Sequence, residues 1–95
     1  MIRIKYFPEE LRLQVRGHAN YAPAGQDIVC AGVSALYGAL LLHPLVVQST
    51  EHDWLILQPV TGAHSVMRPL FELIMAALAD MAGTYPDHIK LHSYR

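Results

Sequence analysis

The sequence predicts an α+β protein of two layers, in which a mostly antiparallel five-stranded sheet carries two helices on one face. Short runs that alternate apolar and polar residues indicate strands, and two longer stretches with apolar residues at every third or fourth position indicate helices. The connections between successive strand-like runs are short, which favours antiparallel pairs. The expected order is strand, strand, helix, strand, strand, helix, strand.

The first two strands are expected to form a hairpin. Residues 1–7 and 11–16 each alternate between apolar and polar side chains, and Pro8-Glu9-Glu10 joins them as a turn. One face of this hairpin is basic, and it either meets an acidic or RNA-bearing substrate or is an ordinary solvated sheet face. The basic residues are Arg3, Lys5, Arg12 and Arg16.

The first helix is expected to begin behind Asp27. An aspartate followed by Ile-Val-Cys-Ala and an apolar run is typical of an N-cap, so Cys30 falls in the first turn. Asp27 either caps this helix or orients His18, and we favour the cap because its position relative to Cys30 predicts it directly. The helix ends at His43-Pro44, because a residue before proline avoids helical geometry.

The middle of the chain predicts a second hairpin from residues 45–50 and 54–60, joined by Glu51-His52-Asp53. Both faces of this hairpin carry apolar side chains, so we expect it to be buried on both sides. One side would face the core. The other would form a subunit contact or a groove for an apolar peptide.

The second helix is indicated by an apolar stripe that runs from Leu70 to Met81. Ser65 is a candidate cap, although Pro69 is the alternative as the first helical residue. Gly83 is expected to end the helix, and residues 88–94 alternate again as the last strand.

Length and composition narrow the class of protein. A chain of 95 residues is expected to form a single domain, residues 1–95, with a marginal core. Apolar residues make up 53% of the chain and charged residues only 16%, so part of the apolar surface is expected to face a second subunit in a homodimer. A formal net charge of -1 argues against direct nucleic-acid binding through phosphates.

Cysteine and histidine usage indicates a cytoplasmic protein without a metal. A single cysteine cannot form an internal disulfide, and no run resembles a signal peptide or is long enough to cross a membrane. The six histidines lack the spacing of a zinc site, because His88 and His92 lie about 13 Å apart on a strand. We therefore expect neither a metal nor a cofactor.

Cys30 and His18 are the candidate catalytic residues. The first turn of a helix favours a thiolate, and a nearby imidazolium favours it further. Gly17 ends the second strand and places His18 just behind it, so the hypothesis is a nucleophilic Cys-His pair. A backbone N–H at the helix start, that of Cys30 or a neighbour, would bind the oxyanion. The simpler alternatives are a buried apolar cysteine and a solvated histidine.

Two further features accompany the pair. Residues 19–26 are interpreted as a flap over the site, with Tyr21 and Gly25 as its substrate-binding and hinge positions, or else as a rigid loop with Tyr21 packed down. Ser34 lies one turn beyond Cys30 on the same helix face. Its hydroxyl either supports the thiolate or bonds its own preceding turn.

One stretch resembles a known family. Gly17-His18-Ala19, Tyr21-Ala22, Gly25, Asp27-Ile28-Val29-Cys30-Ala31 and Val33-Ser34-Ala35-Leu36 are similar to the signature of the ribosomal-processing cysteine protease (Prp) family. The resemblance implies catalytic roles for Cys30 and His18 and supporting roles for Asp27 and Ser34. It further implies a homodimeric endopeptidase that removes an N-terminal extension from a large-subunit ribosomal protein. Residues 43–64 carry no such resemblance.

Two alternatives stay open at the level of sequence. One is a non-catalytic ribosome-associated or peptide-binding module of the same fold. The other is a related protease with a different target, such as a phage structural protein.

Overall fold

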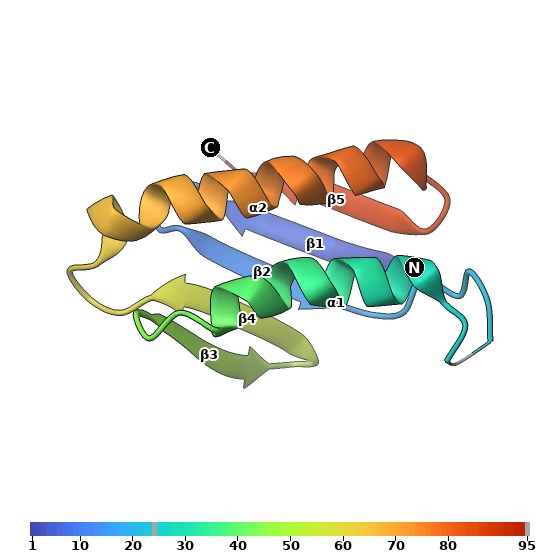
Figure 1. Cartoon of the computed structure of the whole chain (residues 1–95), viewed down its shortest axis with the longest axis horizontal. Helices are drawn as coiled ribbons and strands as arrows, with labels where there is room; N and C mark the ends of the chain where they lie inside the picture. The colour runs from blue at the N-terminus through green and yellow to red at the C-terminus, as the bar shows by residue number, and fades with distance from the viewer. Residues whose placement is uncertain (24, 95) are drawn as a thin grey trace.

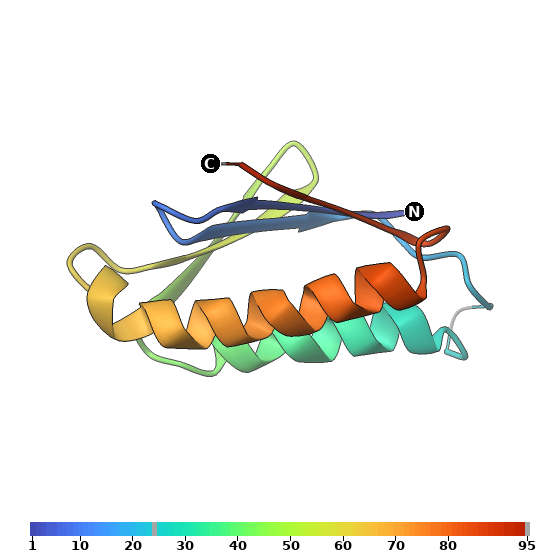
Figure 2. The ribbon, with the colours of Figure 1, turned by 90° about the horizontal axis from the view of Figure 1, so that it is seen from above.

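Two helices cover one face of a single sheet in the part of the chain that the structure describes, residues 1–23 and 25–94 (Figures 1 and 2). The structure is a computed structural model. Its elements in chain order are β1 Ile2–Phe7, β2 Arg12–Arg16, α1 Ile28–Leu41, β3 Val46–Glu51, β4 Trp54–Pro59, α2 His64–Thr84 and β5 Ile89–Ser93. The α+β class, the element order and the placement of both helices on one face are confirmed.

The five strands of the described residues lie in the order β3-β4-β2-β1-β5. The pairs β1 with β2, β2 with β4, and β3 with β4 are antiparallel. Only β5 runs parallel to its neighbour, β1, because α2 returns the chain to the other edge of the sheet before β5 begins. The sheet is therefore mostly antiparallel, as predicted.

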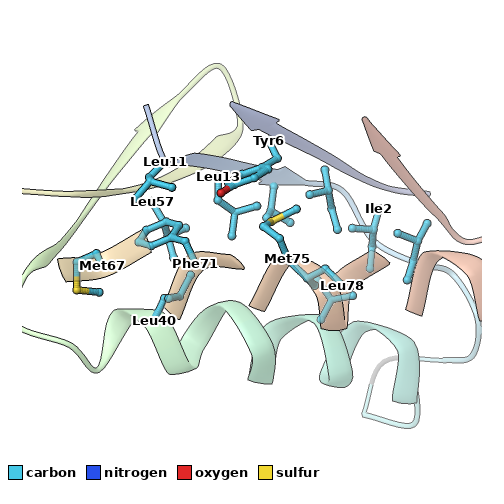
Figure 3. Packing of buried hydrophobic residues seen from close by; sticks show 14 of the residues in the cluster. Ile2, Tyr6, Leu11, Leu13, Leu40, Leu57, Met67, Phe71, Met75 and Leu78 are labelled. Carbon is cyan, nitrogen blue, oxygen red and sulfur yellow. The ribbon is translucent and has the colours of Figure 1, made fainter. Parts of the chain in front are cut away.

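The core lies between the sheet and the helices (Figure 3). Alternate residues of the strands, such as Ile4 and Leu13, point toward the helices and are almost completely buried. Phe71 and Leu78 of α2 have no exposed surface and pack in the same cluster. Burial of this kind, at about 25 cal/mol for each Å² of apolar surface, is the main force that holds the two layers together.

The limits of α2 differ from the prediction. The helix begins at His64 behind Ala63, so Ser65 is not its cap and Pro69 is not its first residue but lies inside it. Proline removes one backbone hydrogen bond in a helix, yet Met67 and Phe71 on either side of it are fully buried. Their packing carries the helix through this position. The helix also continues past Gly83 to Thr84, whose hydroxyl donates to the carbonyl of Asp80.

Of the two strands of the second hairpin, β4 is largely buried and β3 is exposed. β4 contributes Leu57, with no exposed surface, to the core. β3 lies at the edge of the sheet, and its residues from Val47 to Glu51 are all exposed. An edge strand has a neighbour on one side only, so apolar residues in its sequence do not ensure burial. The prediction of burial on both sides is therefore wrong for β3, whereas it holds for β4, where the adjacent Ile56 and Leu57 point to opposite faces and are both buried.

Candidate active site

A sharp turn at Gly17 presents His18 at the end of β2. Gly17 has φ +90°, and a Cβ atom there would lie 2.3 Å from the carbonyl oxygen of Met1. Only glycine fits both the left-handed backbone and this close approach. The amino group of Met1 donates to the carbonyl oxygen of His18, which ties the turn to the start of β1. The His18 side chain is exposed beyond this anchored backbone.

Asp27 caps α1, as predicted. Its Oδ1 accepts hydrogen bonds from the backbone N–H groups of Val29 at 3.0 Å and Cys30 at 2.9 Å. These bonds satisfy two of the first-turn donors and fix Cys30 in that turn. Oδ2 accepts from the N–H of Tyr21 at 3.1 Å, so the same carboxylate joins the preceding loop to the helix start. The Cys30 amide is the largest cause that holds the pKa of Asp27 below its usual value.

His18 and Cys30 open into one cavity of about 480 Å³ at the N-terminal end of α1. Gly25, Asp27 and Ser34 line the same cavity. The structure thus brings together five of the six residues that the sequence singled out. In Figure 1 this region is the loop between β2 and α1, close to the N-terminus of the chain.

Tyr21, the sixth residue, is not part of that lining. Its ring packs edge-on against Tyr85 at 5.6 Å and against His88 at 5.2 Å between ring centroids. Nδ1 of His88 lies 2.9 Å from the carbonyl oxygen of Ala19, to which it donates. The loop is thus fastened to the segment that joins α2 to β5. One position of the predicted flap, Ala24, lies outside the described residues.

The sulfur of Cys30 has a backbone donor. The N–H of Ala19, directly after His18, donates to Sγ at 3.2 Å, and the Cys30 side chain is partly buried. This hydrogen bond fixes the sulfur directly against the backbone of the residue that follows His18.

Of the two donors that the sequence offered for the oxyanion, Cys30 or a neighbour at the helix start, the Cys30 N–H is already bonded to the Asp27 carboxylate. The N–H of Ala31 is also occupied, because it donates to the carbonyl of Asp27. Ile28 is the first helical residue and lines the cavity. Within residues 1–23 and 25–94 no hydrogen bond from its amide is seen, so it is the candidate donor of the first turn there.

Ser34 makes a contact that the sequence did not suggest. The Tyr37 hydroxyl donates to Ser34 Oγ at 3.5 Å, a long hydrogen bond. Ser34 lines the cavity, but the hydrogen bonds recorded within residues 1–23 and 25–94 include none between its hydroxyl and the sulfur of Cys30 or its own preceding turn.

Tyr85 and His88 were not identified from the sequence as part of this region. Their contacts join residues far apart in the chain, such as Ala19 and His88, so no local spacing rule could find them. The position of His88 at the start of the last strand was the only available signal.

Within residues 1–23 and 25–94, no three His, Cys, Asp or Glu side chains lie together as metal ligands would. Neither helix in that part of the chain combines the length and hydropathy needed to cross a membrane.

A cysteine in a capped first turn and a histidine on the same open cavity, on a two-layer α+β fold, fit the class of cysteine proteases. The model of the cysteine protease Prp family matches residues 1–90, and the chain belongs to this family. The resemblance seen in the sequence is thereby confirmed.

Relatives and solved structures agree with this assignment. The ribosomal processing cysteine protease Prp of Mycoplasma genitalium is 30% identical over 84 residues, which are 84% of this chain and 85% of that protein. The Bacillus subtilis protein of the same name is 55% identical over 31 residues, 32% of this chain and 28% of its own. The fold is also that of Staphylococcus aureus Prp with a covalently linked product peptide, at TM-score 0.78, 20% identity and coverage of 99% and 100%.

The Asp27 cap gives a testable dependence of stability on pH. The lowered pKa means that the folded state favours the carboxylate, so this stabilisation is present above the unfolded pKa of 3.8 and is lost as pH falls through the folded value. We expect Asp27→Ala to lower the melting temperature by about 5 °C at pH 7. The difference in melting temperature between the wild type and Asp27→Ala should shrink below pH 3.8. There Asp27 of the unfolded wild type is protonated, and the carboxylate no longer favours the folded state as strongly.

Thermal unfolding followed by circular dichroism at a series of pH values measures this. Asp27→Asn is the matched control, since its amide oxygen can still cap α1 but its NH₂ group cannot accept from Tyr21. It should fall between the wild type and Asp27→Ala. A constant difference between wild type and Asp27→Ala from pH 7 to pH 2 would contradict the role given to the charge.

Proposed function

We propose that the chain acts as a single-domain cysteine endopeptidase, without a cofactor, in which Cys30 is the nucleophile and His18 the general base and acid. The observation that carries this proposal is that both side chains line one open cavity at the start of α1. Asp27 and Ser34 are proposed to support the pair, the first by fixing the helix start and the second from the cavity wall.

The proposed reaction begins when the Cys30 thiolate attacks the scissile carbonyl carbon and a tetrahedral oxyanion forms. The Ile28 amide is the proposed oxyanion donor, and removal of such a donor typically costs about 3 kcal/mol. The C–N bond then breaks, and His18 gives its proton to the leaving amine. A thioester remains on Cys30. His18 next takes a proton from water, whose oxygen attacks the thioester and releases the acid and the thiolate.

The proposed substrate is the N-terminal extension of a large-subunit ribosomal protein, cleaved in the cytoplasm. The Mycoplasma and Bacillus relatives are named for ribosomal processing, and the Staphylococcus protein was crystallised with product and substrate peptides. Ile28, 59% exposed on the cavity wall, offers an apolar surface for an apolar or aromatic segment of the extension. Residues 19–26 would act as the flap, with Gly25, at φ +86°, as its hinge; the Tyr21 ring would leave its contacts with Tyr85 and His88 to meet the substrate.

Incubation with the extended ribosomal protein from the same genome tests the proposal. Mass spectrometry should record a shortened protein with one new N-terminus for the wild type and an unchanged protein for Cys30→Ala. A cut by both proteins would identify a contaminant. If the wild type and Cys30→Ala both leave the extension intact but the wild type alone cleaves another peptide, the protease has a different target. Absence of any Cys30-dependent cleavage would favour the non-catalytic module.

We also propose that the protein is a homodimer. Val66, Leu70 and Leu73 lie on one stripe of α2 and are 63%, 40% and 70% exposed. Apolar side chains in a continuous stripe on the surface typically mark a protein contact, and the chain is 53% apolar. A second copy would cover the stripe by a two-fold contact of the same surfaces.

Leu73→Glu is expected to convert the dimer to a monomer, because a pair of buried carboxylates would face each other across the contact. Light scattering coupled to size-exclusion chromatography gives the mass directly. Thr84→Glu, an exposed position at the end of the same helix, adds the same charge away from the stripe and should leave the dimer intact. A monomeric wild type at about 100 µM would refute the contact.

A further inference from the structure

The sheet face that the helices leave uncovered gathers most of the positive charge of the protein. Of its seven Lys and Arg residues, five point to this side, because they alternate along β1, β2 and β5 with residues buried under the helices. Figure 2 shows both helices on the opposite side of the sheet. We call this surface the open sheet face; its basic residues are Arg3, Lys5, Arg12, Arg16 and Lys90.

Aromatic side chains lie among these cations. The Lys5 ammonium and the Arg16 guanidinium lie 4.7 Å and 4.5 Å from the ring centroid of Trp54. A second group lies toward the end of β5, where the rings of Phe7 and Tyr94 stack at 4.8 Å. The Arg12 guanidinium lies 4.2 Å from the Phe7 centroid, and the His92 ring lies 4.3 Å from that of Tyr94. The outer faces of the stack are therefore covered, and Tyr94, 40% exposed, presents its edge to a ligand.

The charge on the open sheet face is hardly neutralised from within. In the described part of the chain the one ion pair of Lys or Arg with a carboxylate joins Arg12 to Glu10 at 2.7 Å. Arg3 stands directly opposite Arg16 on β2 and beside Lys90 on β5. Like charges in facing positions of a sheet destabilise it. An external anion would relieve that repulsion.

The open sheet face also contains a depression. Arg3, Lys5, Arg16 and Lys90 line a depression of about 420 Å³ together with Trp54 and Tyr94. None of its lining residues belongs to the cavity of Cys30, so the two surfaces can be occupied at the same time.

We propose that the open sheet face binds single-stranded RNA, with the cations on its phosphates and the Trp54 and Tyr94 rings against its bases. Cationic surfaces that carry exposed aromatic rings bind single strands in this way, because every base has a face that can stack. An acidic peptide would satisfy the charges but has no use for the rings. The net charge of -1 does not oppose this binding, since it averages over two unlike faces of the molecule. The inference concerns a binding surface and stands independently of the proposed protease activity.

Fluorescence anisotropy with a labelled twelve-nucleotide oligouridine tests the proposal on the full chain. The double variant Arg3→Gln/Lys90→Gln removes two positive charges from exposed positions. We expect its affinity to fall about tenfold at 50 mM salt, and the slope of log K against log salt to become shallower by about 1.4. Tyr94→Leu should weaken binding about fivefold with an unchanged slope, because stacking is not a counterion effect.

Thr61→Glu/Ser65→Glu is the matched control, since it changes the net charge by the same amount at two exposed positions, one in the connection from β4 to α2 and one in the first turn of α2. It should bind within threefold of the wild type, and circular dichroism should show that all variants are folded. Equal losses in the control and in Arg3→Gln/Lys90→Gln would overturn the assignment to the open sheet face. Binding of labelled hexaglutamate as tight as that of oligouridine would identify an acidic peptide ligand, and no anisotropy change at 100 µM protein would refute RNA binding.

Discussion

Replacement of Cys30 or His18 by alanine is expected to lower kcat/KM for peptide cleavage by at least about a thousandfold. Loss of the nucleophile removes the covalent route, and a positioned acid and base is typically worth 10² to 10⁴ in rate. Residues that act as one unit lose nearly the same activity singly and together. The double variant should therefore be no slower than the slower single variant. Both residues line the cavity, so their loss leaves the core intact.

Cleavage of a fluorogenic peptide, with circular dichroism as the folding check, measures the effect. His92→Ala removes an exposed imidazole from β5, outside the lining of the cavity, and should keep cleavage within twofold of the wild type. Alkylation by iodoacetamide adds a second readout. The wild type should label at lower pH than His18→Ala if the imidazolium stabilises the thiolate. A His18→Ala protein that keeps a tenth of the activity would remove His18 from the proposed pair.

The parts of the structure that the sequence predicted correctly depend on local rules. Asp27 could be identified as a cap because its carboxylate bonds amides only two and three residues ahead. The strands of the first hairpin followed from the alternation of residues such as Ile4 and Lys5, which point to opposite faces. These interactions need no knowledge of the remaining chain.

The parts that the sequence did not predict depend on contacts between distant segments. Pro69 suggested a helix start, but burial of Met67 before it and Phe71 after it outweighs the lost hydrogen bond. β3 has apolar residues, but its place at the sheet edge is decided by which strand pairs with β4. Local pattern determines the type of an element, and tertiary packing determines its ends and exposure.

The same distinction applies to the candidate site. The sequence placed Cys30 in a first turn and His18 behind a strand, and the shared cavity is what the structure adds. The bond from Ala19 to the Cys30 sulfur and that from His88 to Ala19 arise from tertiary folding. They fix the backbone between the two candidate residues, and no spacing rule contains them.

Phe71→Ala is expected to have the largest effect on stability. The side chain has no exposed surface and lies at the contact of α2 with the sheet (Figure 3). Loss of a buried phenylalanine typically costs 3 to 5 kcal/mol, because apolar burial is lost and a cavity remains. A small domain has about 5 kcal/mol in total, so the variant should be largely unfolded near 37 °C.

Urea denaturation followed by circular dichroism measures this loss as a decrease of the midpoint by about 2 to 3 M, given a slope near 1.5 kcal/mol per M. Glu72→Ala is the matched control, because it shortens the next side chain on the same helix at an exposed position and should change the midpoint by less than about 0.3 M. If Phe71→Ala and Glu72→Ala unfold at the same urea concentration, α2 does not rest on the sheet through Phe71.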